Sequence, residues 1–189
     1  QEIQKIEQTT NHDFKAIEYW MRSKLPKELE NWIHFGLTSQ DATNIAQALM
    51  ITGALKEVII PKLEEIHKCT IALAQQYKGT PMLARTHGQS ASPTTFGKEM
   101  AVFASRLKRQ LKQLKEHKLT SKLNGATGNH NALAIAYPKT DWIAFSKKFI
   151  TSLGLEPNLI TTQIEPYDNQ VELFDTMRRI NMILIGFDQ

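Results

Sequence analysis

The chain has 189 residues, a formal net charge of +4 and a pI near 9.1. This length fits one domain with a sizeable core. Its single cysteine, Cys69, excludes an intrachain disulfide and a site built from several thiolates, and we expect a small core or boundary residue there. Because the chain shows neither a signal peptide nor an apolar stretch that could span a bilayer, we expect a cytoplasmic protein without membrane contact.

The positive charge does not indicate a nucleic-acid partner. The densest basic run lies on one helical pattern and has no aromatic residues among it, so we interpret it as a solvated helix face. Its members are Lys108, Arg109, Lys112, Lys115, Lys118 and Lys122. The histidines follow no ligand spacing such as HExxH, so we expect no metal.

In chain order, the first break in a helical pattern is Asn11-His12-Asp13, with Asp13 as the expected N-cap of the next helix. A long helix is predicted over about 39–78, interrupted at Pro61. Its apolar residues recur every three or four positions: Ile45, Ala48, Thr52, Leu55, Ile59, Leu63, Ile66, Thr70, Leu73 and Tyr77. This spacing places them on one helix face.

A second long helix is predicted from Phe96 to about Leu114, with Ser92 as its cap. A shorter helix is predicted between Asp141 and Gly154, and a third long one from Asp168 to Phe187. Short extended segments are expected only around residues 124–137. The fold class is therefore all-α: long helices packed as a bundle, with short extended segments in loops.

The long helices have more apolar face than a chain of this size can cover, so we expect a homo-oligomer. The chain opens on Gln1 and closes within the apolar run Ile183–Phe187. We interpret residues 1–189 as the central helical-bundle region of a longer protein.

The segment Arg85-Thr86-His87-Gly88-Gln89 is the strongest candidate for chemistry. It is expected in a loop between two long helices, where binding and catalytic groups often lie. The ordinary pKa of histidine, about 6.5, suits proton transfer near neutral pH.

Five segments, in order, resemble adenylosuccinate lyases of the fumarase/aspartase superfamily. They are TTNHD (9–13), IHFGLTSQD (33–41), RTHGQSASPTTFGKEM (85–100), NGATGNHNA (124–132) and TTQIEP (161–166). The resemblance implies β-elimination of fumarate from adenylosuccinate, giving AMP, and from the succinyl-carboxamide ribotide of purine biosynthesis. It also implies no cofactor, and a homotetramer with active sites shared between subunits.

The resemblance also implies residue roles. His87 is the expected general acid, and His12 is the second catalytic candidate. Substrate binding is expected of Asn11, His12, Asp13, His34, Thr38, Ser39, Thr86, Gln89 and Gln163. Thr38 and Ser39 precede a helix whose N-terminus suits a carboxylate, although ordinary capping explains them too.

Gly125 and Gly128 are expected to serve loop geometry, since the loop lacks the spacing of a phosphate-binding motif. The family's catalytic base is a serine in a signature that this sequence lacks, so we place the base outside the chain and expect the chain alone to be inactive. Two alternatives stay open: another fumarate-releasing lyase of the superfamily, or a non-catalytic helical assembly module.

Overall fold

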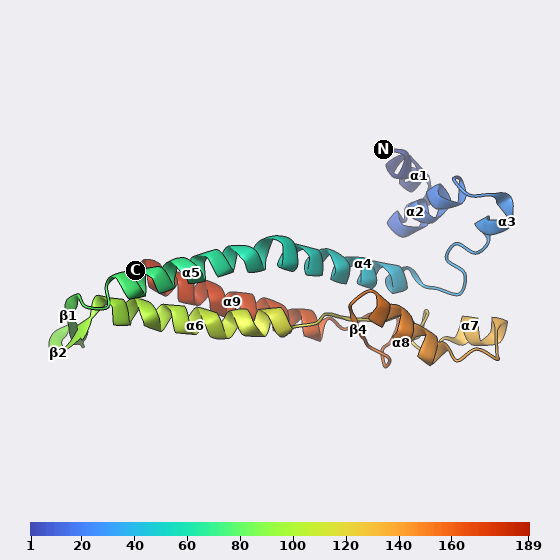
Figure 1. Cartoon of the computed structure of the whole chain (residues 1–189). Coiled ribbons are helices and arrows are strands. Elements are labelled where there is room, and N and C mark those ends of the chain that lie inside the picture. The colour runs from blue at the N-terminus through green and yellow to red at the C-terminus, as the bar shows by residue number, and fades with distance from the viewer. The chain divides into compact units, whose positions relative to one another are not determined.

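The computed structural model describes all 189 residues, and the chain forms two compact units. The first unit contains residues Gln1–Met50 and Leu119–Tyr167, and the second contains Ile51–Lys118 and Asp168–Gln189. Helices dominate both units, which confirms the predicted all-α bundle (Figure 1). None of the helices combines the length and the apolar character needed to cross a membrane.

The first unit begins with two short helices that pack on each other, α1 (Glu2–Thr10) and α2 (Asp13–Arg22). Asn11 between them has a left-handed backbone, with φ of 51°. The predicted break is confirmed, but the predicted cap is wrong. His12 is the N-cap, since its Nδ1 accepts a hydrogen bond from the Lys15 N–H at 3.3 Å. Asp13 instead opens the helix, where its charge complements the helix dipole.

The rest of the first unit consists of short elements joined by ordered loops. These are α3 (Lys27–Glu30), the start of α4 (Ser39–Ala54), β3 (Thr120–Ser121), α7 (Asn131–Ala136), α8 (Trp142–Ser152) and β4 (Glu156–Pro157). The strands β3 and β4 pair in parallel. Asp141 caps α8 as predicted, through a 2.9 Å bond from the Ala144 N–H.

In the second unit, α5 (Ile60–Gln76), α6 (Phe96–Glu116) and α9 (Asp168–Asp188) lie side by side (Figure 1). Their buried faces follow the helical spacing of the sequence. The buried residues of these three helices are Leu63, Thr70, Gly97, Ala104, Leu107, Leu111, Leu114, Gln170, Leu173, Thr176, Ile180 and Ile183. These apolar stripes are the physical reason that three helices pack together.

The helix that leads into α5 changes pitch at the expected place. A π-helical turn, η1 (Leu55–Ile59), separates α4 from α5, and Pro61 is the second residue of α5. Proline has no N–H and crowds the carbonyl one turn earlier, and a π-turn is one of the forms that accommodate such a disruption. The predicted interruption at Pro61 is confirmed.

The segment between α5 and α6 corrects two expectations. It is an antiparallel hairpin of β1 (Pro81–Thr86) and β2 (Gln89–Thr95), whereas extended segments were expected only around 124–137. Ser92 lies within β2, so Thr95 caps α6 instead, through a 3.2 Å bond from the Lys98 N–H. Two short runs separated by His87-Gly88 form a hairpin pattern in the sequence, and this pattern was the available signal.

Two further expectations are wrong. Cys69 is exposed rather than in the core or at its boundary. Helix α6 ends at Glu116, so Lys118 and Lys122 do not continue its basic face. The periodic spacing of lysines suggested a longer helix, but the chain becomes extended at His117, where φ is −67° and ψ is 129°.

Candidate functional site

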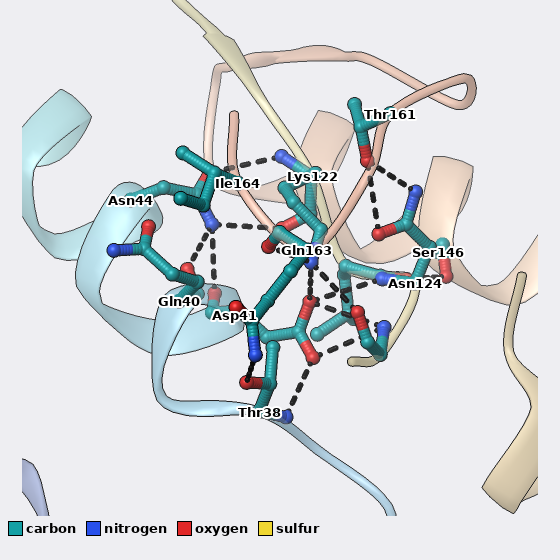
Figure 2. Close-up of polar contacts among 12 residues, drawn as sticks. Thr38, Gln40, Asp41, Asn44, Lys122, Asn124, Ser146, Thr161, Gln163 and Ile164 are labelled. Carbon is teal, nitrogen blue, oxygen red and sulfur yellow. Dashed lines mark hydrogen bonds and ion pairs between the residues drawn. The ribbon is translucent and has the colours of Figure 1, made fainter. Parts of the chain in front are cut away.

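The N-terminus of α4 carries a carboxylate that is surrounded by hydrogen-bond donors. Asp41 is fully buried. Its Oδ2 accepts from the Thr38 N–H at 3.0 Å, and its Oδ1 accepts from the Asn124 N–H at 3.1 Å. The Gly125 N–H approaches both oxygens, at 3.3 and 3.1 Å. Lys122 Nζ completes the set at 2.8 Å from Oδ1 (Figure 2). Asp41 therefore joins the start of α4 to the loop after β3.

Lys122 is also fully buried, which corrects its expected place on a solvated helix face. Besides Asp41, its ammonium group contacts two backbone oxygens, Gly125 O at 3.0 Å and Gln163 O at 2.8 Å. Its own backbone is held by Asn44 of α4. The Lys122 N–H donates to Asn44 Oδ1 at 2.9 Å, and Asn44 Nδ2 donates to Lys122 O at 3.0 Å. All three ammonium protons thus have acceptors.

The network brings together two of the predicted substrate-binding residues. Gln163 Nε2 donates to Thr38 Oγ1 at 3.4 Å, across a gap of 125 residues in the sequence (Figure 2). Gln163 itself is exposed, whereas Thr38 is buried and Ser39 lies at intermediate depth. Ser39 is the first residue of α4, where free N–H groups and the helix dipole favour an anion.

The loop at residues 124–130 depends on left-handed backbone at three positions, Gly125, Gly128 and His130, with φ of 83°, 76° and 56°. A Cβ on Gly128 would overlap the Thr161 carbonyl oxygen. The expected geometric role of both glycines agrees with these angles. His130 is buried, and its Nε2 lies 2.9 Å from Ser146 Oγ and 3.0 Å from Leu123 O, so it is a packed polar residue.

His34 also has a left-handed backbone, with φ of 66°, and its ring packs 5.1 Å from that of Phe14. Burial lowers the pKa of His34, and the neighbouring Lys15 adds to this, while the Glu18 carboxylate opposes it. Glu18 is almost fully buried and pairs with Lys15 at 2.8 Å and with Arg22 at 2.6 Å. His34 therefore packs against α2 through Phe14, in surroundings that disfavour its protonated form.

Asn11, His12 and Asp13 are exposed at the turn between α1 and α2. The described bonds of His12 and Asp13 are local, since His12 Nδ1 accepts from Lys15 and Asp13 Oδ1 accepts from the Phe14 N–H at 2.6 Å. No bond joins these three residues to Thr38 or Gln163. Within the first unit, the structure thus links Thr38 and Gln163 and leaves the 11–13 turn separate.

Thr86, His87 and Gln89 lie in the second unit, at the tip of the β1–β2 hairpin. Thr86 pairs with Gln89, and His87 and Gly88 form the two-residue turn, with φ of 51° and 76°. Positive φ at both central residues is the mark of a type I′ turn, whose twist suits a hairpin. His87 is exposed, so its imidazole is open to a ligand.

Sequence reasoning missed Asp41 and Lys122, which organise the site. A signal was available, because Lys122 stands between Ser121 and the apolar Leu123, two residues before the NGATGN loop begins. Another group near the site is the half-buried Tyr167, whose hydroxyl donates to Gln40 Oε1 at 3.2 Å. Burial, and then the charge of Glu165, raises the pKa of Tyr167.

The chain is similar to known proteins along its whole length. A family model described as lyase matches residues 1–189. An adenylosuccinate lyase of Haemophilus influenzae is 50% identical over 192 residues, which cover 99% of this chain and 42% of the relative. The adenylosuccinate lyases of Escherichia coli K12 and Dictyostelium discoideum are 48% and 49% identical, again with 42% of each relative covered. The chain thus spans less than half the length of these relatives.

Solved structures give the same picture of the fold. The crystal structure of a fumarate lyase from Mesorhizobium sp. BNC1 aligns with a TM-score of 0.83 and 25% identity, over 97% of this chain and 42% of that one. A β-carboxy-cis,cis-muconate cycloisomerase from Acinetobacter calcoaceticus aligns with a TM-score of 0.74 and 22% identity, over 94% of this chain and 41% of that one. The second likeness concerns the fold alone.

Proposed function

Because the chain belongs to the lyase family, whose model it matches from end to end, we propose that it is the central part of an adenylosuccinate lyase. The enzyme would release fumarate from adenylosuccinate, giving AMP, and from the succinyl-carboxamide ribotide. One observation carries this proposal: relatives that are named adenylosuccinate lyase are 48–50% identical over nearly the whole chain. The motifs TTNHD and TTQIEP favour this lyase over others of the superfamily.

In the proposed elimination, a base removes a proton from the carbon beside a substrate carboxylate. The electron pair left on that carbon forms the double bond of fumarate as the carbon–nitrogen bond breaks. The departing nitrogen then takes a proton from His87, the general acid. The exposed position of His87 at a hairpin tip supports this role, because its imidazole is open to a bound molecule. Thr86 and Gln89 flank it and would hydrogen-bond the substrate.

Thr38 and Ser39 would bind a substrate carboxylate. Support comes from their place at the start of α4, where the helix dipole and free N–H groups favour an anion. The Gln163 amide can both donate and accept, so it would recognise the nucleotide. Its 3.4 Å contact with Thr38 supports a common site for these residues.

The other residues that are predicted to contact the substrate lie in the first unit. Asn11, His12 and Asp13 would bind the phosphate or succinyl group, with His12 assisting His87. Their exposure supports access by a ligand. His34 would line the site as a hydrogen-bonding group whose lowered pKa disfavours the protonated form.

Four parts of the proposal concern the whole enzyme. The catalytic base would come from a serine outside this chain, and the reaction would need no metal or other cofactor. The enzyme would be a cytoplasmic homotetramer in which several subunits contribute to each site. Apolar side chains that are exposed along α9 support self-association, namely Val171, Phe174, Met182 and Ile185.

A second candidate is a related lyase that releases fumarate from another succinylated compound, and the likeness to the Mesorhizobium fumarate lyase favours it. The deciding experiment offers the purified full-length enzyme adenylosuccinate and, separately, argininosuccinate, and quantifies the fumarate released. We expect release from adenylosuccinate alone. Release from argininosuccinate alone would replace the proposal with the second candidate, and release from neither would favour a non-catalytic helical module.

A further inference from the structure

The pair of Asp41 and Lys122 has no role in the proposed chemistry, although it lies beside residues that do. Both side chains are fully buried, and their charged atoms are 2.8 Å apart. Burying two charges costs solvation energy that their attraction repays only with very good geometry, and apolar side chains of similar size are often as stable. A contribution to stability alone is therefore a weak explanation for this pair.

The pair is saturated with hydrogen bonds. A carboxylate offers about four acceptor positions. Asp41 fills them with the N–H groups of Thr38, Asn124 and Gly125 and with the Lys122 ammonium. Lys122 donates its three ammonium protons to Asp41 and to the carbonyl oxygens of Gly125 and Gln163. Because no position is free, neither side chain can rotate without breaking bonds to the backbone.

The two ends of this network are the residues proposed to bind substrate. Asp41 holds the backbone N–H of Thr38, and Lys122 holds the backbone oxygen of Gln163 at 2.8 Å (Figure 2). The segment at 161–165 has neither helix nor strand, so its own backbone does not fix its position. Its other described ties to the β3 region are made by Thr161 and Glu165. Lys122 is thus the residue that holds the backbone of Gln163, whereas the Gln163 side chain contacts Thr38.

We propose that Asp41 and Lys122 are positioning residues that set the distance between Thr38 and Gln163 and so shape the substrate-binding face of the first unit. This inference rests on the proposed function for its effect on substrate, although the placement of the two residues can be measured separately. The pair touches only the backbone of the two binding residues, so the Thr38 hydroxyl and the Gln163 amide, which contact each other at 3.4 Å, are not engaged by either charge.

The test replaces the charge with a side chain of similar length, Lys122→Met, in the full-length enzyme. Lys118→Met is the matched control, because Lys118 is exposed four residues earlier. We expect KM for adenylosuccinate to rise by about 10- to 100-fold in Lys122→Met, with a smaller change in kcat, since misplaced groups lose binding and alignment. The control should keep both constants. A folded Lys122→Met enzyme with an unchanged KM would overturn the proposal.

A second variant is needed because Lys122→Met leaves the Asp41 carboxylate buried without its partner, which can itself cause misfolding. Asp41→Asn combined with Lys122→Met removes both charges but still leaves Gln163 O without its donor. We expect the double variant to regain thermal stability relative to Lys122→Met while its KM stays high. Recovery of both stability and KM would reduce the pair to a structural role. If neither variant folds, the pair is likewise assigned a structural role and the positioning proposal is rejected.

Amide hydrogen exchange gives a readout that does not depend on turnover. In the Lys122→Met or double variant, we expect faster exchange in peptides that cover residues 36–41 and 161–165, and unchanged exchange in a peptide from α6. If the wild-type enzyme does not cleave adenylosuccinate, the proposed function fails, but this measurement still decides the positioning role. Unchanged exchange in both loop peptides would refute that role.

Discussion

Gly128 is the position where one added methyl group should do the most damage to the candidate site. Its φ of 76° is strained for alanine by about 1–2 kcal/mol. A Cβ there would overlap the Thr161 carbonyl oxygen and lie 2.9 Å from Thr162 O. Neither atom belongs to a flexible side chain, so the backbone must shift, at a cost of about 1–3 kcal/mol for overpacking. Gly128→Ala should therefore destabilise the chain by roughly 2–5 kcal/mol.

Gly154 provides a matched control, because its φ is 77° and a Cβ there would meet nothing within 4 Å. Gly154→Ala should cost only the backbone strain of about 1–2 kcal/mol. Urea unfolding of both variants measures the difference, which isolates the contact with the 161–162 backbone. In the full-length enzyme, Gly128→Ala should also raise KM, since Gln163 follows directly. Equal losses of stability in the two variants would refute the packing argument.

Three further predictions concern single side chains. His87→Ala should lower kcat for adenylosuccinate by on the order of 10²–10⁴, while His67→Ala on α5 should not, and a near-normal kcat would remove His87 from the mechanism. Ser39→Ala should weaken substrate binding by roughly 1–3 kcal/mol, whereas a lower melting temperature with unchanged KM and kcat would indicate capping alone. His34 should make stability fall as pH drops below about 6.5, because the unfolded chain then binds a proton that the folded chain resists. His34→Asn, which tolerates the left-handed backbone, should flatten that dependence in urea unfolding at pH 5 to 8, and an unchanged slope would contradict the assignment.

The long helices could be predicted from the sequence because their apolar residues repeat at the helical period. On α6, for example, the spacing of Leu107, Leu111 and Leu114 fixes which face is buried before any partner is known. Pro61 likewise marked an interruption through a local property, the missing N–H. The resemblance carried by the five motifs agreed with the lyase family model.

The hairpin and the caps required more than periodicity. Ser92 and Thr95 both have side chains that can cap α6, and only the pairing of β1 with β2 decides that Thr95 does so. The N-cap of α2 is His12 and not Asp13, because the left-handed backbone at Asn11 turns the chain one residue before the expected position. Capping is a competition between neighbours, which composition alone does not resolve.

The buried network was decided by tertiary structure alone. Lys122 follows the spacing of exposed lysines in the sequence, and a lysine is seldom buried without a partner. Its partner, Asp41, is 81 positions away, and its acceptor at Gln163 is 41 positions away. The chain must fold before these groups meet, because no local pattern encodes a distance between the start of α4 and two separate loops. The sequence by itself determined the helices and the residue types for chemistry, whereas packing decided which charges are buried and what they hold in place.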